Sequence, residues 1–108
     1  MKLPDDVVIP TEKLTEYLLV WRARNDKSVF LARAGYTAAN WRLLESDIRK
    51  LVRASDAEPD GLNDFGEFFV VRGKLVGPNN STLKAKTVWI QLSETDEIRF
   101  VTLVPDQE

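Results

Sequence analysis

The spacing of apolar residues divides this chain into a helical first half and a strand-forming second half. Near the start, four large side chains recur at helical intervals: Leu14, Tyr17, Leu18 and Trp21. This spacing predicts a helix that begins after Thr11, ends near Trp21 and buries all four on one stripe.

Two more helices are predicted before the pattern changes. Asp26 suits the N-cap of a short helix that ends at Gly35, because glycine enters the left-handed region without steric cost. Thr37 can cap a longer helix that runs to about Val52. Its apolar residues keep helical spacing: Trp41, Leu44, Ile48 and Leu51.

The second half alternates with the period of strands. Three runs rich in β-branched and aromatic residues predict strands: Glu67–Val76, Leu83–Leu92 and Glu97–Val104. Turn-forming residues separate them, and such short connections join antiparallel neighbours. Residues 54–65 are acidic and rich in turn formers, so they predict a surface loop. Residues 1–9 hold a short apolar run between two prolines and predict an extended edge segment.

These elements predict one α+β domain over residues 1–108, in which N-terminal helices pack on a C-terminal antiparallel β-meander of three or four strands. A length of 108 residues fits a single domain. No apolar window is long enough to cross a bilayer, and the N-terminus lacks the apolar region of a secretory signal. We therefore expect a cytoplasmic protein of bacterial type that makes no membrane contact.

Composition removes several kinds of chemistry. The chain has no cysteine and no histidine, so disulfides, thiolate metal sites and histidine-dependent catalysis are excluded. We expect no metal and no cofactor. The net charge of −2 disfavours non-specific coating of nucleic acid. The charge is uneven, however, because residues 13–53 hold nine basic and four acidic side chains, an excess of +5.

A set of short motifs extends over nearly the whole chain. They comprise Lys13 before Tyr-Leu-Leu, Lys27 before a helix that ends in Gly35-Tyr36, the turn Gly77-Pro78, the strand segment Thr87-Val88-Trp89, and Arg99, Thr102 and Pro105 in the last strand. In this order they resemble a bacterial family of small domains of unknown function. The layout of that family is similar to that of ribonuclease-like toxin domains.

The resemblance to ribonuclease-like toxins implies a metal-independent site for RNA cleavage. Lys13 or Lys27 would transfer protons, provided that its pKa fell well below about 10.4. Arg99 would hold the phosphate and Thr102 would bond a phosphate oxygen. Tyr36 or Trp89 would stack on a base.

The spacing of Arg99 and Thr102 argues against that site. Residues three apart face opposite sides of a regular strand, so these two share a site only at a bulge or a strand end.

A second hypothesis is a protein-interaction or assembly role in a toxin system, with an antitoxin-like partner or a second copy as the ligand. Net acidity, the lack of histidine and a free edge strand near Val7 favour it. We take this binding role as the first hypothesis and RNA cleavage as the alternative. Convergence of Lys13, Lys27, Arg99 and Thr102 on one surface would favour cleavage, and their dispersal would favour binding.

Overall fold

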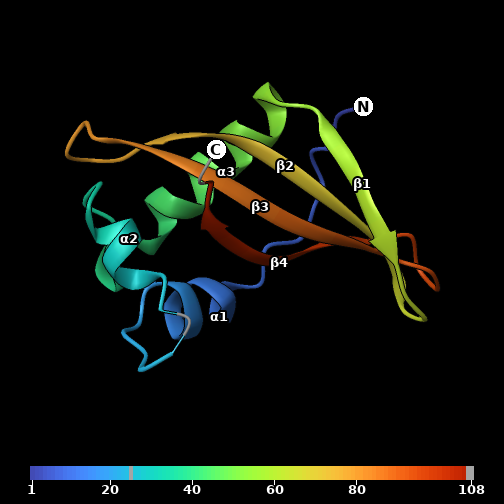
Figure 1. The fold of residues 1–108 in the computed structure, drawn as a ribbon, viewed down its shortest axis with the longest axis horizontal. Coiled ribbons are helices and arrows are strands. Elements are labelled where there is room, and N and C mark those ends of the chain that lie inside the picture. Colours follow the sequence, from blue (N-terminus) through green and yellow to red (C-terminus); the bar gives the residue numbers. More distant parts are fainter. Residues whose placement is uncertain (25, 107–108) are drawn as a thin grey trace.

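One antiparallel sheet holds the C-terminal half of the chain in the computed structural model, which describes residues 1–24 and 26–106. Its strands follow the chain order: β1 (Ala57–Leu62), β2 (Gly66–Val76), β3 (Thr82–Leu92) and β4 (Ile98–Pro105). Each strand pairs antiparallel with the next, which makes the sheet a meander (Figure 1). The predicted α+β class, with helices first and a meander after them, is confirmed.

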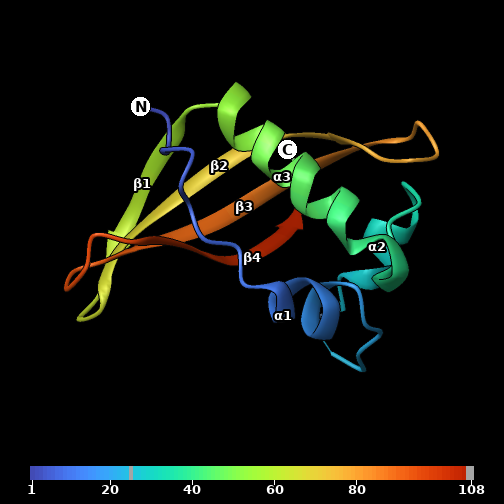
Figure 2. The ribbon, with the colours of Figure 1, turned by 180° about the vertical axis from the view of Figure 1, so that it is seen from behind.

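Helix α3 (Trp41–Ala54) covers one face of this sheet, as the view from behind shows (Figure 2). Its buried side chains keep the predicted helical spacing: Leu44, Ile48, Leu51 and Val52. A 3-10 turn, η2 (Ala38–Asn40), leads into it, and the backbone N–H of Thr37 donates to Asn40 Oδ1 at 2.7 Å. We call the sheet face turned away from α3 the outer face.

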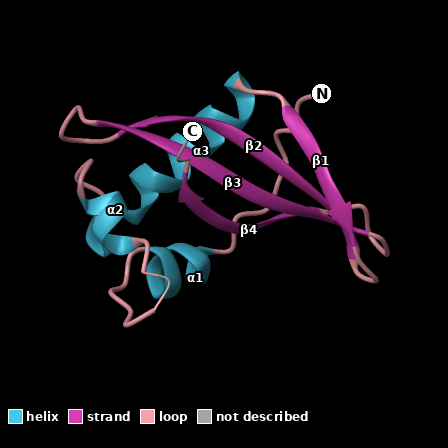
Figure 3. Ribbon diagram, in the orientation of Figure 1, coloured by secondary structure: helices cyan, strands magenta, loops and turns pink. Residues whose placement is uncertain are grey.

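Strand β1 forms where the sequence predicted a loop, and that prediction was wrong (Figure 3). Residues Ala57–Leu62 include Pro59, Asp60 and Gly61, which disfavour strands by composition. They pair because β2 offers an open row of backbone groups, and an edge strand tolerates proline. The pairing register shifts between Pro59 and Leu62, and only Ala57 is buried.

The first helix is shorter than predicted. It consists of α1 (Thr11–Lys13) and a π-helical turn, η1 (Leu14–Leu18), in which the N–H of Leu19 bonds the carbonyl of Leu14 at 3.0 Å. Leu14 and Leu18 are fully buried, as predicted. Trp21 lies beyond the helix and is 70% exposed, so its predicted burial was wrong.

Helix α2 (Ser28–Ala32) forms within the predicted range, with Asp26 two residues before it and Gly35 three residues after it. The carboxylate of Asp26 accepts hydrogen bonds from the N–H groups of Ser28 and Val29, both at 3.3 Å. Gly35 has φ +92°. A side chain at Gly77 would collide with the carbonyl of Ala34, so the β2–β3 turn packs closely on the end of this helix.

Residues 1–9 run along the α3 side from β1 to β4 (Figure 2). The N–H of Ala57 bonds the carbonyl of Met1 at 2.6 Å, and Val8 pairs in parallel with Arg99. The predicted extended edge segment is only partly confirmed, because a turn interrupts it at residues 5–6, Val8 alone forms a bridge, and Val7 is 4% exposed instead of lying on a free edge. The binding role therefore loses one of its supports.

The centre of the core contains a chain of hydrogen bonds between β2 and β3. The indole N–H of Trp89 donates to Thr87 Oγ1 at 2.8 Å, and that hydroxyl donates to the carbonyl of Val71 at 2.9 Å. The ring of Phe100 meets the Trp89 ring edge to face at 5.3 Å. Thr87, Trp89, Phe100 and Val71 are all buried.

No helix among the described residues is long and apolar enough to span a bilayer.

Substitution of Thr87 by valine should lower the free energy of unfolding by about 1–3 kcal/mol. The shape is kept, but the indole N–H of Trp89 and the carbonyl of Val71 lose their partner. Urea unfolding followed by circular dichroism would measure the loss.

In a double-mutant cycle, Trp89→Phe should cost about 1 kcal/mol less in the Thr87→Val background than in the wild type. Strict additivity would contradict this account.

Candidate functional site

A bulge in β4 places Arg99 and Thr102 on the same face of the sheet. Trp89 pairs with Phe100, whereas its neighbour Val88 pairs with Thr102, so Val101 is an extra residue without a partner. The alternation of side chains therefore shifts by one position. Phe100 before the bulge and Leu103 after it are both buried. Arg99 and Thr102 both lie on the outer face, so the geometric objection drawn from their spacing is removed.

Three cations surround the ring of Tyr17. The Lys13 Nζ, Arg22 Cζ and Lys27 Nζ atoms lie 5.7, 5.3 and 5.5 Å from its centroid. The Lys27 ammonium also donates to the phenol oxygen at 3.3 Å. These four residues and Thr102 are called the Tyr17 cluster.

Local structure explains how distant cations reach one ring. Lys13 precedes Tyr17 by four residues, so the two share a helix face. Asp26 Oδ1 accepts a hydrogen bond from the N–H of Arg22 at 3.1 Å and another from the Ser28 hydroxyl at 2.7 Å. This carboxylate ties the loop before α2 to the start of α2, and thereby positions Arg22 and Lys27 beside η1.

The Thr102 hydroxyl has the largest effect on the chemistry of Tyr17. It lowers the pKa of the phenol below its usual value, with further lowering by the hydrogen bond and charge of Lys27 and by the charge of Lys13. Partial burial opposes these effects without reversing them. Thr102 Oγ1 is itself buried, and it forms no hydrogen bond that meets both distance and angle criteria with any described residue. It is therefore available to donate to a Tyr17 phenolate.

Arg99 lines a shallow cavity of about 320 Å³ beside this cluster. The lining residues are Pro10, Glu12, Lys13, Ile90, Arg99, Phe100 and Val101. Lys13 belongs to both the cavity and the Tyr17 cluster, and so connects the two. Arg99 Nε forms an ion pair with Glu97 at 3.2 Å, and its side chain remains 43% exposed. The guanidinium can accordingly exchange this carboxylate for a phosphate.

The structure brings the four predicted polar residues to one region. Lys13, Lys27 and Thr102 meet at Tyr17, and Arg99 shares a cavity with Lys13. The sequence missed Tyr17, because its helical spacing placed it with the buried leucines. Its position four residues after Lys13, on the same helix face, was the signal that could have predicted Tyr17 as a site residue.

Tyr36 and Trp89 do not fit the stacking role predicted for them. Their side chains are 1% and 0% exposed, so neither ring offers a free face to a base. The Tyr36 hydroxyl donates to Asp47, and burial together with that carboxylate raises the pKa of Tyr36.

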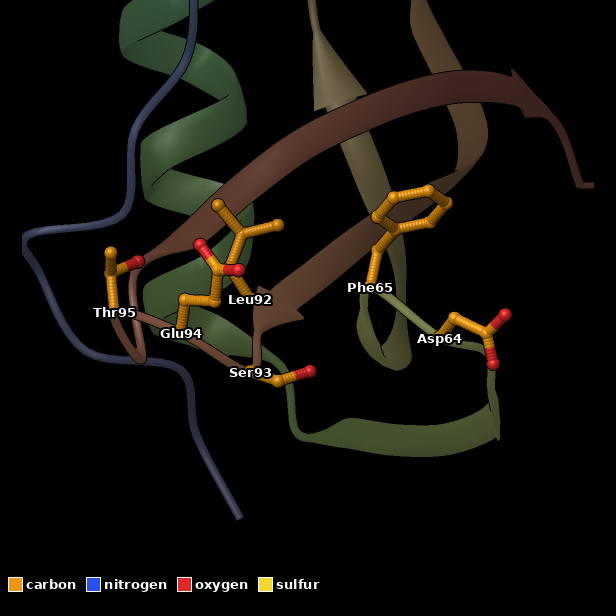
Figure 4. Close-up of a pocket in the computed structure, with 6 residues that line it drawn as sticks. All are labelled: Asp64, Phe65, Leu92, Ser93, Glu94 and Thr95. Carbon is orange, nitrogen blue, oxygen red and sulfur yellow. The ribbon is translucent and has the colours of Figure 1, made fainter.

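A second cavity, of about 290 Å³, lies at the end of the sheet where the β1–β2 and β3–β4 turns meet (Figure 4). The β1–β2 and β3–β4 turns form it, and its lining includes Asp64, Phe65 and Glu94 but no cation. No group of three or more potential ligand side chains among the described residues is arranged to hold a metal ion. This end offers an apolar, acidic surface.

Comparison with known proteins adds a family and a fold. A protein-family model described as Domain of unknown function (DUF6883) matches residues 2–107. No curated protein matches the chain. A chain of the solved "Contact-dependent growth inhibition toxin - immunity protein complex from Klebsiella pneumoniae 342" superposes with a TM-score of 0.67 over 95% of this chain and 96% of that chain, at 14% identity. At that identity the likeness concerns the fold, and it agrees with the toxin-like layout predicted from the sequence.

The lowered pKa of Tyr17 can be measured because the chain has only two tyrosines. In a Tyr36→Phe variant, ultraviolet absorbance should show the remaining phenol deprotonating below its ordinary pKa of about 10. Adding Thr102→Val or Lys27→Met should raise that midpoint, because each removes a group that stabilises the phenolate. Thr95→Val, in the β3–β4 turn outside the Tyr17 cluster, should leave the midpoint unchanged. An unmoved midpoint in both cluster variants would refute the assignment.

Proposed function

We propose that this chain, which belongs to the DUF6883 family of domains of unknown function, is a toxin-system component that cleaves RNA without a metal ion. The observation that carries the proposal is the convergence of Lys13, Lys27, Thr102 and Arg99 around Tyr17 and its neighbouring cavity. The sequence alone favoured a binding role. The convergence now favours cleavage.

The chemistry requires a base for the ribose 2′-hydroxyl. The Tyr17 phenolate takes that proton, and the 2′-oxygen attacks phosphorus. A lowered pKa suits a base that works near neutral pH, since it increases the fraction of phenolate. Lys27 and Thr102 stabilise the phenolate before the proton arrives.

The leaving 5′-oxygen needs a proton and the phosphorane needs positive charge. The Lys13 ammonium, which faces both Tyr17 and the cavity, donates the proton as the bond from phosphorus to the 5′-oxygen breaks. Arg99 holds the non-bridging oxygens, for which its planar fork of donors is suited. The products are a 2′,3′-cyclic phosphate and a 5′-hydroxyl, and Tyr17 returns its proton to Lys13 through solvent.

The test uses purified protein, a mixed-sequence RNA pool and a buffer that contains a chelator. Cleavage should yield 2′,3′-cyclic phosphate ends. Tyr17→Phe should slow it by roughly 10²- to 10⁴-fold, because it removes the base. Arg99→Ala should slow it by roughly 10²- to 10³-fold, because it removes charge stabilisation.

Arg53→Ala is the matched control for Arg99→Ala. Arg53 is also exposed and pairs with one carboxylate, that of Asp5 at 3.3 Å, but it lies on α3. Its loss should leave the rate unchanged. Intact RNA after incubation with folded wild-type protein, or equal loss in both arginine variants, would sink the proposal.

Binding of a protein partner is a second candidate function, supported by the acidic end of the sheet. Leu62 and Phe65 there are 79% and 73% exposed, and neighbouring exposed apolar side chains are typical of interaction surfaces. The neighbouring stretches carry seven carboxylates, of which Glu97 pairs with Arg99: Glu58, Asp60, Asp64, Glu67, Glu94, Asp96 and Glu97. This surface suits a basic partner with an apolar anchor. The solved complex that shares the fold contains a toxin and an immunity protein, which adds support.

Coexpression with the product of the adjacent gene, followed by size-exclusion chromatography, would test this candidate. A complex that is lost in Leu62→Ser/Phe65→Ser and kept in Val20→Ser/Val29→Ser would support it, since those valines are also exposed but lie after η1 and in α2. A complex that survives the first double variant would show that the partner binds elsewhere.

A further inference from the structure

Four cations stand in register on the outer face of β2 and β3. A side chain at Gly73 would touch Leu51 and Ser55, so odd-numbered positions of β2 face α3 and even-numbered ones face outward. Arg72 lies directly across from Lys86, and Lys74 directly across from Lys84. These four residues are called the cation ladder.

The ladder is unfavourable for the sheet by itself. Like charges directly opposite each other on an antiparallel pair destabilise it. Arg72 is compensated by Asp106, with 3.0 Å between Nη1 and Oδ1. Among the described residues, no carboxylate forms an ion pair with Lys74, Lys84 or Lys86. The α3 side of these strands is held by apolar residues such as Leu75 and Leu83, so packing does not require lysine at the outward positions.

Along β3 and β4, the cation ladder lies next to the Tyr17 cluster on the outer face. Thr102 pairs with Val88, and the next outward pair on β3 and β4 is Lys86 with Val104. Successive outward residues of a strand are about 7 Å apart. That interval is comparable with the spacing of phosphates along a single nucleic-acid strand.

Apolar side chains lie on the same face beside the site. Phe68 pairs with Ile90, and Ile90 pairs with Arg99, so an aromatic ring, an aliphatic chain and a guanidinium form one row across the sheet. All three are partly exposed. Partly exposed aromatic rings on a sheet are suited to stacking with unpaired bases, which a duplex does not present.

Charge is divided between the two ends of the sheet. The turns next to β1 and the start of β4 are acidic, whereas the ladder lies toward the β2–β3 turn (Figure 1). The net charge of −2 therefore conceals a basic surface, and it does not argue against binding of a polyanion.

We propose that the cation ladder binds the phosphates of single-stranded RNA on one side of the bond that is cut. The strand crosses the outer face from the Tyr17 cluster toward the β2–β3 turn, with Lys86 and Lys84 meeting successive phosphates. This inference rests on the proposed function for its choice of RNA. The ladder contributes affinity and direction, whereas the Tyr17 cluster contributes the chemistry.

The experiment measures binding and cleavage separately. The probe for binding is a mixed-sequence oligonucleotide with 2′-O-methyl groups on every ribose, which cannot be cut by attack of a 2′-oxygen. Its association constant is measured by fluorescence anisotropy at several salt concentrations. The variant is Lys84→Gln/Lys86→Gln. Lys74 is left unchanged, because it also borders a cavity next to Asp47 and Lys50 of α3. The control is Lys2→Gln/Arg53→Gln, which removes the same charge from exposed residues paired with Asp56 and Asp5.

For the ladder variant, the slope of log association constant against log salt should fall by about 1.4, which is about 0.7 for each lost phosphate contact. The control should keep the wild-type slope. Cleavage of a dinucleotide, which is too short to reach the ladder, should be unchanged by Lys84→Gln/Lys86→Gln.

Each outcome decides one of the two claims. Absence of binding by the wild type, or equal slopes in the variant and the wild type, overturns the ladder even if Tyr17→Phe abolishes cleavage. A reduced slope without any cleavage of RNA supports the ladder as a nucleic-acid site and overturns the proposed chemistry. Loss of dinucleotide cleavage in the ladder variant would also count against the division of roles.

Discussion

One extra residue in β4, Val101, determines where the polar side chains of the last strand point. Without the bulge, the alternation that buries Ile98 and Phe100 would turn Thr102 toward the core and Leu103 away from it. With the bulge, Phe100 and Leu103 both contribute to the core, and Arg99 and Thr102 both reach the outer face. The bulge lies opposite Val88 and Trp89, next to the buried hydrogen bonds of Thr87. A buried, hydrogen-bonded part of the core therefore supports the position of the site.

The Tyr17 cluster concentrates positive charge where the fold does not need it. Three cations near one ring repel one another, and each gains only about 0.5–1 kcal/mol from the ring face at an exposed site. An anion at the phenol oxygen, or a phosphate between Lys13 and Arg99, would relieve that repulsion. Clusters of this kind, with a shifted pKa at their centre, are typical of functional sites. The π-helical turn that carries Tyr17 is consistent with this, since such turns are rare and occur often at functional sites.

Similarity of fold and similarity of function rest on different evidence here. A TM-score of 0.67 at 14% identity shows that the layout of helices and meander persists when most side chains differ. The layout alone supports many activities. Support for the proposed activity therefore comes from the contacts of Lys13, Tyr17, Thr102 and Arg99 in this chain, and from the uneven charge along its sheet.

Elements with local signals could be predicted from the amino-acid sequence. Helical spacing located α3 and the buried face of η1, Asp26 and Gly35 marked the ends of α2, and the turn residues between the β-rich runs made the meander predictable. The sequence also selected Lys13, Lys27, Arg99 and Thr102 through a resemblance in the order of motifs. Three features could not be predicted in this way: β1 forms a strand, Trp21 is exposed, and Tyr36 and Trp89 are buried. Strand pairing at an edge, the bulge at Val101 and the meeting of three cations at Tyr17 all depend on neighbours distant in the chain, which local periodicity does not encode.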